Sequence, residues 1–362
     1  MDDYEKLRRI LHKNITGAPK SEDFQEIMQL LFTPEEVKVA LNMTFGLKRI
    51  DKLAELSGFS VEKASELCES MADKGIIYAR EKDGKMMYAL LSTIPGIFEF
   101  PLMAGGGTPL LDRLGKLWVK YHMEKLTMEF GSSPTPLVRV IPIERTIDSR
   151  NEVLPYEVLS RMMDKNENFA LANCACRVAA GEDACDRPKD VCLIFDWAAD
   201  FLIVRKLAKK ITRQVAEEVL RRAEEAGLVH TTNNCQDRLN LVCNCCPCCC
   251  TVLTGLTKLN TPHPFAMGRW FAAIDGDLCS GCGLCLEERC PVNAIDLDGD
   301  KAVADPDRCI GCGLCASVCP EDAISMDPRK DPVAPPSTIK ELGVQVLMEK
   351  GRLEEFKELN RS

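Results

Sequence analysis

The sequence predicts a multidomain α+β protein, and three observations support that prediction. An N-terminal stretch alternates helix signals with one strong hairpin signal, a central stretch is rich in cysteine, and a C-terminal stretch holds two runs of four cysteines that each close on Cys-Pro. The chain has 362 residues, 46% of them hydrophobic, which is enough for two or three domains with buried cores. The predicted parts are an N-terminal domain, a connector helix, a Cys-rich module, a domain that holds both cysteine runs, and a linker with a C-terminal helix: residues 1–100, 101–135, 136–262, 263–330 and 331–362.

The N-terminal domain has the element order of a winged helix-turn-helix. Residues 1–30 predict one helix that leads into a second. Thr33 and Pro34 then open a helix as cap and first residue, a second helix ends at Gly58, and Ser60 caps a third that stops at Lys74. The Asp-Gly pair at 83–84 lies between two alternating runs, which is a strong hairpin signal and predicts the wing.

The charge of the third helix argues against DNA binding. It carries four acids (Glu62, Glu66, Glu69 and Asp73) against Lys63 and Lys74. Contact with phosphates needs a basic surface, so a protein-docking or structural role is favoured over a sequence-specific DNA contact. Cys68 lies on the apolar face of this helix and is expected to be a buried small hydrophobe.

Further elements follow from apolar periodicity and from proline and glycine. Residues 93–108 predict an irregular connection and 138–143 a buried strand, and the Cys-rich module is predicted to be α/β. Residues 332–336 form a proline-rich linker, and the amphipathic tail 337–360 is expected to dock on the body or on a partner. Helices are predicted at 109–130, 155–165 and 204–228.

The two C-terminal runs carry the strongest chemical signal. The second run, Cys309 to Pro320, has the complete C-x2-C-x2-C-x3-C-P spacing of bacterial ferredoxins. Three thiolates of each run can wrap around one cluster, and glycines at 281, 283, 311 and 313 permit that close wrapping. In two-cluster ferredoxins the cysteine before proline belongs to the opposite cluster. The predicted ligands of one [4Fe–4S] cluster are Cys279, Cys282, Cys285 and Cys319, and those of the other are Cys309, Cys312, Cys315 and Cys290.

The first run departs from this spacing by one residue. Four residues, rather than three, separate Cys285 from Cys290, and a small bulge is expected to absorb the extra one. Structural zinc knuckles are the alternative interpretation, but zinc sites usually show two CxxC pairs rather than two quartets that end in Cys-Pro.

This C-terminal domain is also the acidic part of the chain. Between Asp275 and Asp327 there are twelve acids and three bases, a net charge of −9 that equals the net charge of the whole chain. Such a surface steers encounters with basic patches on redox partners and repels nucleic acid.

The central module predicts a further metal centre. Six of the eight residues from Cys243 to Cys250 are cysteines, and alternate positions can face one centre. The first-rank ligands are Cys174, Cys176, Cys192, Cys243, Cys245, Cys246 and Cys248; Cys185, Cys249 and Cys250 are second-rank, and Cys235 is last. An iron–sulfur cluster is favoured over zinc, and thiol redox chemistry is the remaining alternative. Arg177 is expected to offset thiolate charge, unless it pairs with Glu182 or Asp183.

Cysteine usage and the absence of targeting signals indicate a compartment. The 20 cysteines would suit either a secreted disulfide scaffold or a reduced metal protein. The N-terminus shows no secretory signal and no stretch is apolar enough to cross a membrane, so a reducing cytoplasm is expected. No catalytic residue is predicted, because the chain shows no nucleophile elbow, P-loop or paired-acid pattern.

The whole pattern resembles a family of uncharacterised anaerobe proteins of the 4Fe–4S dicluster ferredoxin type, with an N-terminal winged-helix-like segment. The resemblance rests on these segments: 95–100, 139–142, the Cys-x-Cys-Arg at 174–177, 185–188, 191–192, 226–230, 243–250 and the two ferredoxin runs. Cys235 matches none of its motif cysteines. The resemblance implies electron transfer in anaerobic metabolism and names no substrate.

The expected function is that of an electron carrier or an electron-transfer subunit, with two C-terminal [4Fe–4S] clusters and an additional iron–sulfur or zinc centre. Its partners are expected to be redox proteins, and the winged-helix domain or the C-terminal helix can serve an oligomer or a complex. One alternative is an iron–sulfur redox-sensing transcriptional regulator. Another is an oxidoreductase whose active site is the central module, although a carrier or subunit is favoured over a stand-alone enzyme.

Overall fold

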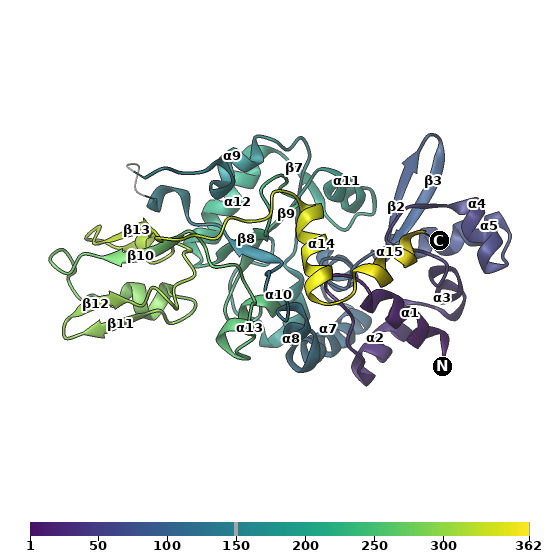
Figure 1. Ribbon diagram of the computed structural model, residues 1–362, viewed down its shortest axis with the longest axis horizontal. Coiled ribbons are helices and arrows are strands. Elements are labelled where there is room, and N and C mark those ends of the chain that lie inside the picture. The colour runs from purple at the N-terminus through teal and green to yellow at the C-terminus, as the bar shows by residue number, and fades with distance from the viewer. Residues whose placement is uncertain (148–150, 362) are drawn as a thin grey trace.

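The computed structural model describes residues 1–147 and 151–361. The molecule is elongated, with the N-terminal helices at one end, four strands (β10–β13) at the other, and a six-stranded sheet between them (Figure 1). Both chain termini lie at the N-terminal end, because the last two helices run back along the body (Figure 1). In the described part of the chain, no helix has the length and apolar character that a membrane crossing requires.

The N-terminal part contains the predicted helices and the predicted hairpin. Its elements are α1 Asp3–His12, α2 Glu22–Leu31, α3 Pro34–Ala40, β1 Lys48–Arg49, α4 Ile50–Ser57, α5 Val61–Asp73, β2 Ile77–Lys82 and β3 Lys85–Leu90. Thr33 and Glu36 form a reciprocal capping box, in which each side chain accepts from the other's backbone N–H. Asp83 and Gly84 both adopt positive φ, as the tight β2–β3 turn requires. The three strands form a sheet in the order β1-β3-β2.

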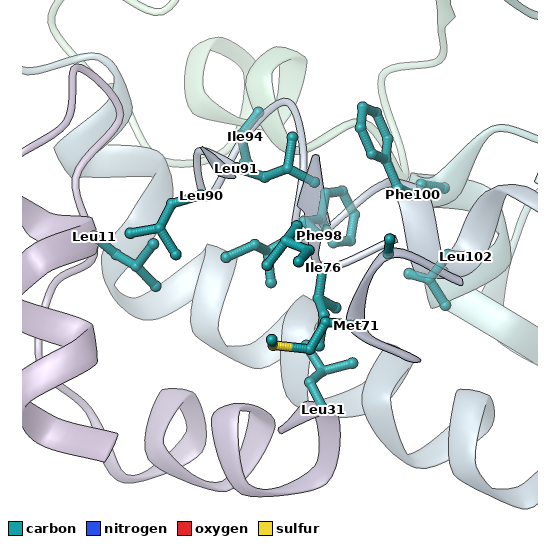
Figure 2. Close-up of a cluster of buried hydrophobic side chains, with 14 of the residues drawn as sticks. Leu11, Leu31, Met71, Ile76, Leu90, Leu91, Ile94, Phe98, Phe100 and Leu102 are labelled. Atoms are coloured by element: carbon teal, nitrogen blue, oxygen red, sulfur yellow. The ribbon is translucent and has the colours of Figure 1, made fainter. Parts of the chain in front are cut away.

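The N-terminal and central parts share one hydrophobic core. Figure 2 shows part of it, where side chains from α1, α2, α5 and β3 meet the segment from Ile94 to Leu102. The same core continues through Phe201 to Ala170 and Cys192 of the central part. Cys68 is fully buried in it, as predicted. The core therefore fixes the N-terminal part against the central sheet.

A polar and aromatic contact reinforces this junction. Arg205 donates to Glu69 at 2.6 Å and to Asp73 at 2.7 Å, so the acidic face of α5 pairs with the end of α11 Asp196–Val204. Tyr78 packs edge-on against Trp197 and Phe201, both at 5.2 Å between ring centroids. Part of the acidity of α5 is thus neutralised inside the molecule.

The connector is a nearly continuous helix, as predicted for residues 109–130. It contains α7 Pro109–Tyr121 and α8 Thr127–Phe130, joined by a π-helical turn at His122–Leu126; the one-turn helix α6 Phe100–Met103 precedes it. Helix α7 packs on α2 and on α10 Ala175–Ala180. The connector therefore links the N-terminal part to the start of the Cys-rich module.

The central sheet has the order β4-β8-β9-β6-β5-β7. Its strands are β4 Val138–Val140, β5 Phe169–Ala172, β6 Cys192–Phe195, β7 Lys209–Ile211, β8 Val229–Asn233 and β9 Leu241–Cys245. Every pairing in it is antiparallel, so the predicted α/β arrangement is wrong and the module is α+β. The surrounding helices are α9 Leu159–Met163, α10, α11 Asp196–Val204, α12 Arg213–Glu225 and α13 Thr251–Thr257.

Two predicted helices of this module are shorter than expected. Helix α12 begins only at Arg213, because residues 209–211 pair with β5 as the edge strand β7. Lys206, at a φ of 59°, ends the preceding helix. In the predicted helix 155–165, the extended conformation of Val158 separates a short 3₁₀ turn from α9.

The C-terminal part consists of two strand pairs and a returning tail. Strand β10 Trp270–Ile274 pairs with β13 Ile324–Pro328, and β11 Ile295–Asp298 pairs with β12 Lys301–Ala304. The tail forms α14 Ile339–Glu349 and α15 Leu353–Arg361, which separate at Gly351. Phe356 stacks on Phe45 at 5.7 Å, so the predicted docking of the tail on the body is confirmed.

Candidate metal centres

The C-terminal part contains two cavities, each lined by four cysteines. The first cavity is lined by Cys279, Cys282, Cys285 and Cys319, and the second by Cys290, Cys309, Cys312 and Cys315. Each set contains three cysteines of one run and the last cysteine of the other. The fold thus brings together the two quartets that the spacing predicts.

Backbone amides point at three of these sulfurs. Ala302 donates to Cys279 Sγ at 3.5 Å, Ala323 to Cys319 Sγ at 3.3 Å and Ala294 to Cys290 Sγ at 3.1 Å. Hydrogen bonds to cysteine sulfur stabilise the thiolate and tune the potential of a cluster that it binds. The amides from Ala302 and Gly281 lower the pKa of Cys279.

A π-helical turn absorbs the extra residue of the first run. Residues Cys285–Arg289 form this turn, and the N–H of Cys290 donates to the carbonyl of Cys285, five residues earlier, at 3.0 Å. The second run has a 3₁₀ turn, Ala316–Val318, in the corresponding place. The bulge expected from the sequence is therefore present, and Cys290 still lines the second cavity.

Two glycines allow the backbone to pass close to a neighbouring carbonyl group. Gly281 has a φ of 71°, and a Cβ there would lie 2.2 Å from the carbonyl oxygen of Asp300. Gly311 has a φ of 75°, and its Cβ would lie 2.4 Å from the carbonyl oxygen of Trp270. At either position, any residue larger than glycine would push its own cysteine loop away from the cavity that the loop lines.

The comparison with known families agrees with this geometry. Residues 272–326 match the family model described as a 4Fe–4S dicluster domain. This part of the chain holds two [4Fe–4S] clusters. None of the curated proteins matches the chain. The matched segment, called the dicluster domain from here on, is acidic and contains all eight cysteines that line the two cavities.

The central module contains a compact group of four thiols. The sulfurs of Cys185, Cys246, Cys248 and Cys249 all lie within 4.8 Å of one another, and we call these residues the four-thiol group. One tetrahedral metal with bonds of about 2.3 Å to sulfur separates its ligand sulfurs by about 3.8 Å. The four-thiol group therefore fits a single zinc or iron ion.

The remaining cysteines at the end of the sheet form a second group. We call it the six-thiol group; its members are Cys174, Cys176, Cys192, Cys243, Cys245 and Cys250. Their thiols interact in succession, from Cys174 to Cys176, then to Cys250 and Cys245, while Cys192 interacts with Cys243. In the described part of the chain, no three of these sulfurs lie mutually within 4.8 Å. This wider spacing suits a polynuclear cluster better than one ion, because several metal atoms lie between the ligands of a cluster.

Local structure explains how the six-thiol group assembles. Cys174 follows β5 and precedes α10, Cys192 begins β6, and Cys243 and Cys245 alternate along β9. Cys192 pairs with Ala172, so the ends of adjacent strands deliver their thiols to one place. Side chains at alternate positions of a strand share a face, which places Cys243 and Cys245 together.

The structure divides the predicted ligands differently from the sequence. Cys246 and Cys248 lie in the four-thiol group, apart from the other first-rank cysteines. The second-rank cysteines Cys185 and Cys249 complete that group. Cys250 joins the six-thiol group, and Cys235 is buried near the carbonyl oxygen of Arg238 at 3.8 Å.

Arg177 lies at the junction of the two groups. Its side chain is fully buried, and its guanidinium donates to the carbonyl of Asn244 at 3.2 Å and to Cys246 Sγ at 3.5 Å. It therefore contacts the thiols rather than Glu182 or Asp183. Hydrogen bonds from Cys249 and Arg177 hold the pKa of Cys246 well below its usual range.

A buried histidine is linked to the six-thiol group through Thr251, and no sequence pattern predicted this link. His122 Nδ1 lies 2.7 Å from Thr251 Oγ1, which in turn lies 3.7 Å from Cys176 Sγ. Burial lowers the pKa of His122 to about 3, so the ring is neutral. His122 comes from the connector, 129 residues before Thr251, and only the folded structure brings the two together.

Proposed function

We propose that the protein is an iron–sulfur electron carrier or electron-transfer subunit in which the dicluster domain and the central module form one electron path. The observation that carries this proposal is a single apolar cluster. It contains Cys245 and Cys250 of the six-thiol group, Cys312 of the second cavity, and aliphatic side chains including Ile310 and Leu314. Buried side chains packed between the two sets of cysteines support electron transfer between them.

The proposed ligand sets follow the two cavities. Cys279, Cys282, Cys285 and Cys319 are proposed to hold one cluster, and Cys290, Cys309, Cys312 and Cys315 the other. The clusters supply one-electron redox chemistry, while the protein supplies thiolates, amide donors and an apolar shell. The acidic surface disfavours an added electron, so we expect potentials toward the low end of roughly −700 to +450 mV.

The central module is proposed to hold two centres. The four-thiol group is assigned one zinc or iron ion, and the six-thiol group an iron–sulfur cluster. Hydrogen bonding among neighbouring thiols, followed by burial, raises the pKa of Cys174 and Cys243, so metal binding there must release protons. Clustered thiols without a metal would be open to oxidation, and ligation removes that hazard.

The N-terminal part is proposed to be a winged-helix-like domain that serves docking rather than DNA binding. Arg205 of the central module already pairs with Glu69 and Asp73 of α5, so these two acids serve a contact within the molecule. The proposed setting is a reducing cytoplasm in an anaerobic redox system. A selection with random DNA at physiological salt tests the proposed docking role of the N-terminal part. Enrichment of one sequence motif would favour the redox-sensing transcriptional regulator instead.

An anaerobic EPR titration of the full-length protein tests the electron-transfer proposal. We expect two magnetically interacting S = 1/2 signals from the dicluster domain on reduction, and an additional signal from the central module. The variant Cys312→Ser is expected to alter the second dicluster signal, whereas Cys68→Ser, a buried cysteine outside all of these groups, is expected to leave every signal unchanged. A fully loaded sample that shows no interacting pair contradicts the proposal.

A further inference from the structure

A separate pocket lies between the central sheet and the dicluster domain, and no cysteine lines it. Its walls come from β4, the 3₁₀ turn at Pro155–Glu157, the start of β10 and the linker segment 332–335; we call it the junction pocket. It encloses about 200 Å³. A single buried water needs only roughly 10–15 Å³, so the pocket has room for a small organic molecule.

Three residues that line the junction pocket carry buried N–H donors with no partner in the described part of the chain. Arg139 is 5% exposed; its Nη2 donates to the carbonyl of Cys235 at 3.2 Å, but its Nε has no acceptor. Trp270 is 1% exposed, and its indole N–H also has no acceptor. The same holds for Nε of Arg269. Unpaired buried donors are costly, so three of them around one cavity point to a missing acceptor.

The charge in the pocket favours an anion. Arg139 and Arg269 are cationic, and among the described residues that line the pocket Glu157 is the one acid. Arg269 Nη1 lies 3.5 Å from a carboxylate oxygen of Glu157, a long contact that leaves the guanidinium incompletely paired. Guanidinium groups recognise carboxylates through paired N–H donors.

Two aromatic residues, Tyr156 and Trp270, are among those that line the pocket. The guanidinium of Arg139 lies 5.7 Å from the Tyr156 ring centroid, and that of Arg269 lies 5.4 Å from the Trp270 ring centroid. Pro332 and Pro335 close the linker side. Such walls complement a planar apolar body better than a compact, fully hydrated ion.

We propose that the junction pocket binds a small carboxylic acid anion with a planar body, whose carboxylate accepts from Arg139, Arg269 and the Trp270 indole. The bound molecule would lie beside the second cluster loop, because Trp270 contacts Gly311 and the N–H of Ile143, just beyond β4, donates to the Cys312 carbonyl at 3.0 Å. This proposal does not depend on the proposed function: the pocket can bind its ligand whether or not the central module carries electrons.

Anaerobic calorimetry on the fully loaded, full-length protein tests the proposal with benzoate and phenylacetate as carboxylate probes. Benzyl alcohol is the neutral analogue and inorganic phosphate the compact anion. We expect at least one carboxylate to bind with a Kd of about 1 mM or below, and benzyl alcohol and phosphate to bind at least roughly tenfold more weakly. Equal binding of the neutral analogue, preferred binding of phosphate, or no binding of either carboxylate overturns the proposal.

Matched variants locate the binding site. Arg269→Gln is expected to weaken carboxylate binding by roughly tenfold or more, and Trp270→Phe to weaken it by a smaller factor, since it keeps an aromatic wall and removes only the N–H. Arg308→Gln is the control, because Arg308 is an exposed arginine of the dicluster domain that does not line the pocket. Unchanged EPR signals confirm that each variant is folded and loaded. If Arg269→Gln and Arg308→Gln bind the carboxylate equally well, the site is not the junction pocket.

Discussion

Arg177 donates from Nη1 to Cys246 Sγ at 3.5 Å, and its side chain is fully buried. A buried guanidinium is costly unless anionic groups compensate it. In the described part of the chain no carboxylate pairs with Arg177, so the compensating charge must come from thiolates. Thiolates persist in such a buried place when a metal holds them. The position of Arg177 thus supports metal binding in the central module independently of the cysteine count.

Replacing Arg177 tests this relationship. The variant Arg177→Met keeps a long apolar side chain and removes the charge. We expect it to lose metal from the central module and to keep the iron of the dicluster domain, because the thiol that Arg177 contacts belongs to the central module. Metal analysis after anaerobic purification measures both. Arg187→Met is the control, since Arg187 is a nearby arginine that bonds the carbonyl of Ala226 instead of a thiol. Full metal content in Arg177→Met contradicts the assignment.

The four-thiol group makes a prediction for single cysteines. Cys185→Ser is expected to remove one tightly bound metal ion per chain, because three thiolates hold a structural ion far less well than four. The expected loss of metal-binding free energy is a large part of the roughly 10–16 kcal/mol that a structural zinc ion contributes to the folding of small zinc domains. Competition with a chelator of known affinity measures the loss. Cys235→Ser, at a buried cysteine outside the group, is expected to release no metal.

Glu129 makes a prediction for pH. It accepts from Arg352 at 2.7 Å and from Lys350 at 3.1 Å, which ties the tail to the connector. Burial alone would raise the pKa of Glu129, but these bonds outweigh it and lower the pKa below its ordinary value of 4.5. Because the folded pKa is lowered, this stabilisation is complete above pH 4.5 and is lost only as the pH falls through the folded value.

The variant Glu129→Gln is therefore expected to lower the free energy of unfolding by about 2 kcal/mol, with the same loss at pH 8, 7 and 6. Anaerobic urea unfolding monitored by circular dichroism measures it. Glu354→Gln is the control, because Glu354 forms an exposed pair with Lys357 on α15 and its loss is expected to change nothing measurable. A loss that shrinks between pH 8 and pH 6 would show that the carboxylate titrates in that range.

Arg205 makes a prediction for the junction of the N-terminal and central parts. Its side chain is 10% exposed, while its partners Glu69 and Asp73 are 39% and 68% exposed. Solvent screening at the two acids limits the loss of unfolding free energy expected for Arg205→Gln to about 1–2 kcal/mol. Hydrogen exchange is expected to rise in α5 and α11 and to stay unchanged in the dicluster domain. Unchanged exchange in α5 would show that the ion pairs do not fix it.

Local features such as cysteine spacing could be predicted from the sequence, whereas contacts between segments that are distant in the chain could not. The crossed cysteine quartets follow from the spacing together with the rule that, in two-cluster ferredoxins, the cysteine before proline belongs to the opposite cluster. The four-thiol group depends on Cys185 meeting Cys246, which lies 61 residues later in the chain, and no local signal encodes that contact. Strand β7 was missed because its pairing with β5 overrides the helical pattern around it. The contacts that link His122 to Cys176 through Thr251 also join segments that are distant in the chain, so no local pattern predicts them.

Counting iron, acid-labile sulfide and zinc in the anaerobically purified full-length protein tests the central claim most directly. Two [4Fe–4S] clusters account for about eight iron atoms and eight sulfides per chain. The proposed electron path predicts iron and sulfide beyond that number from the six-thiol group, together with one zinc or iron ion from the four-thiol group. A fully folded protein with eight irons, eight sulfides and no other metal would contradict it, and would leave the central cysteines as free thiols beside an ordinary two-cluster domain.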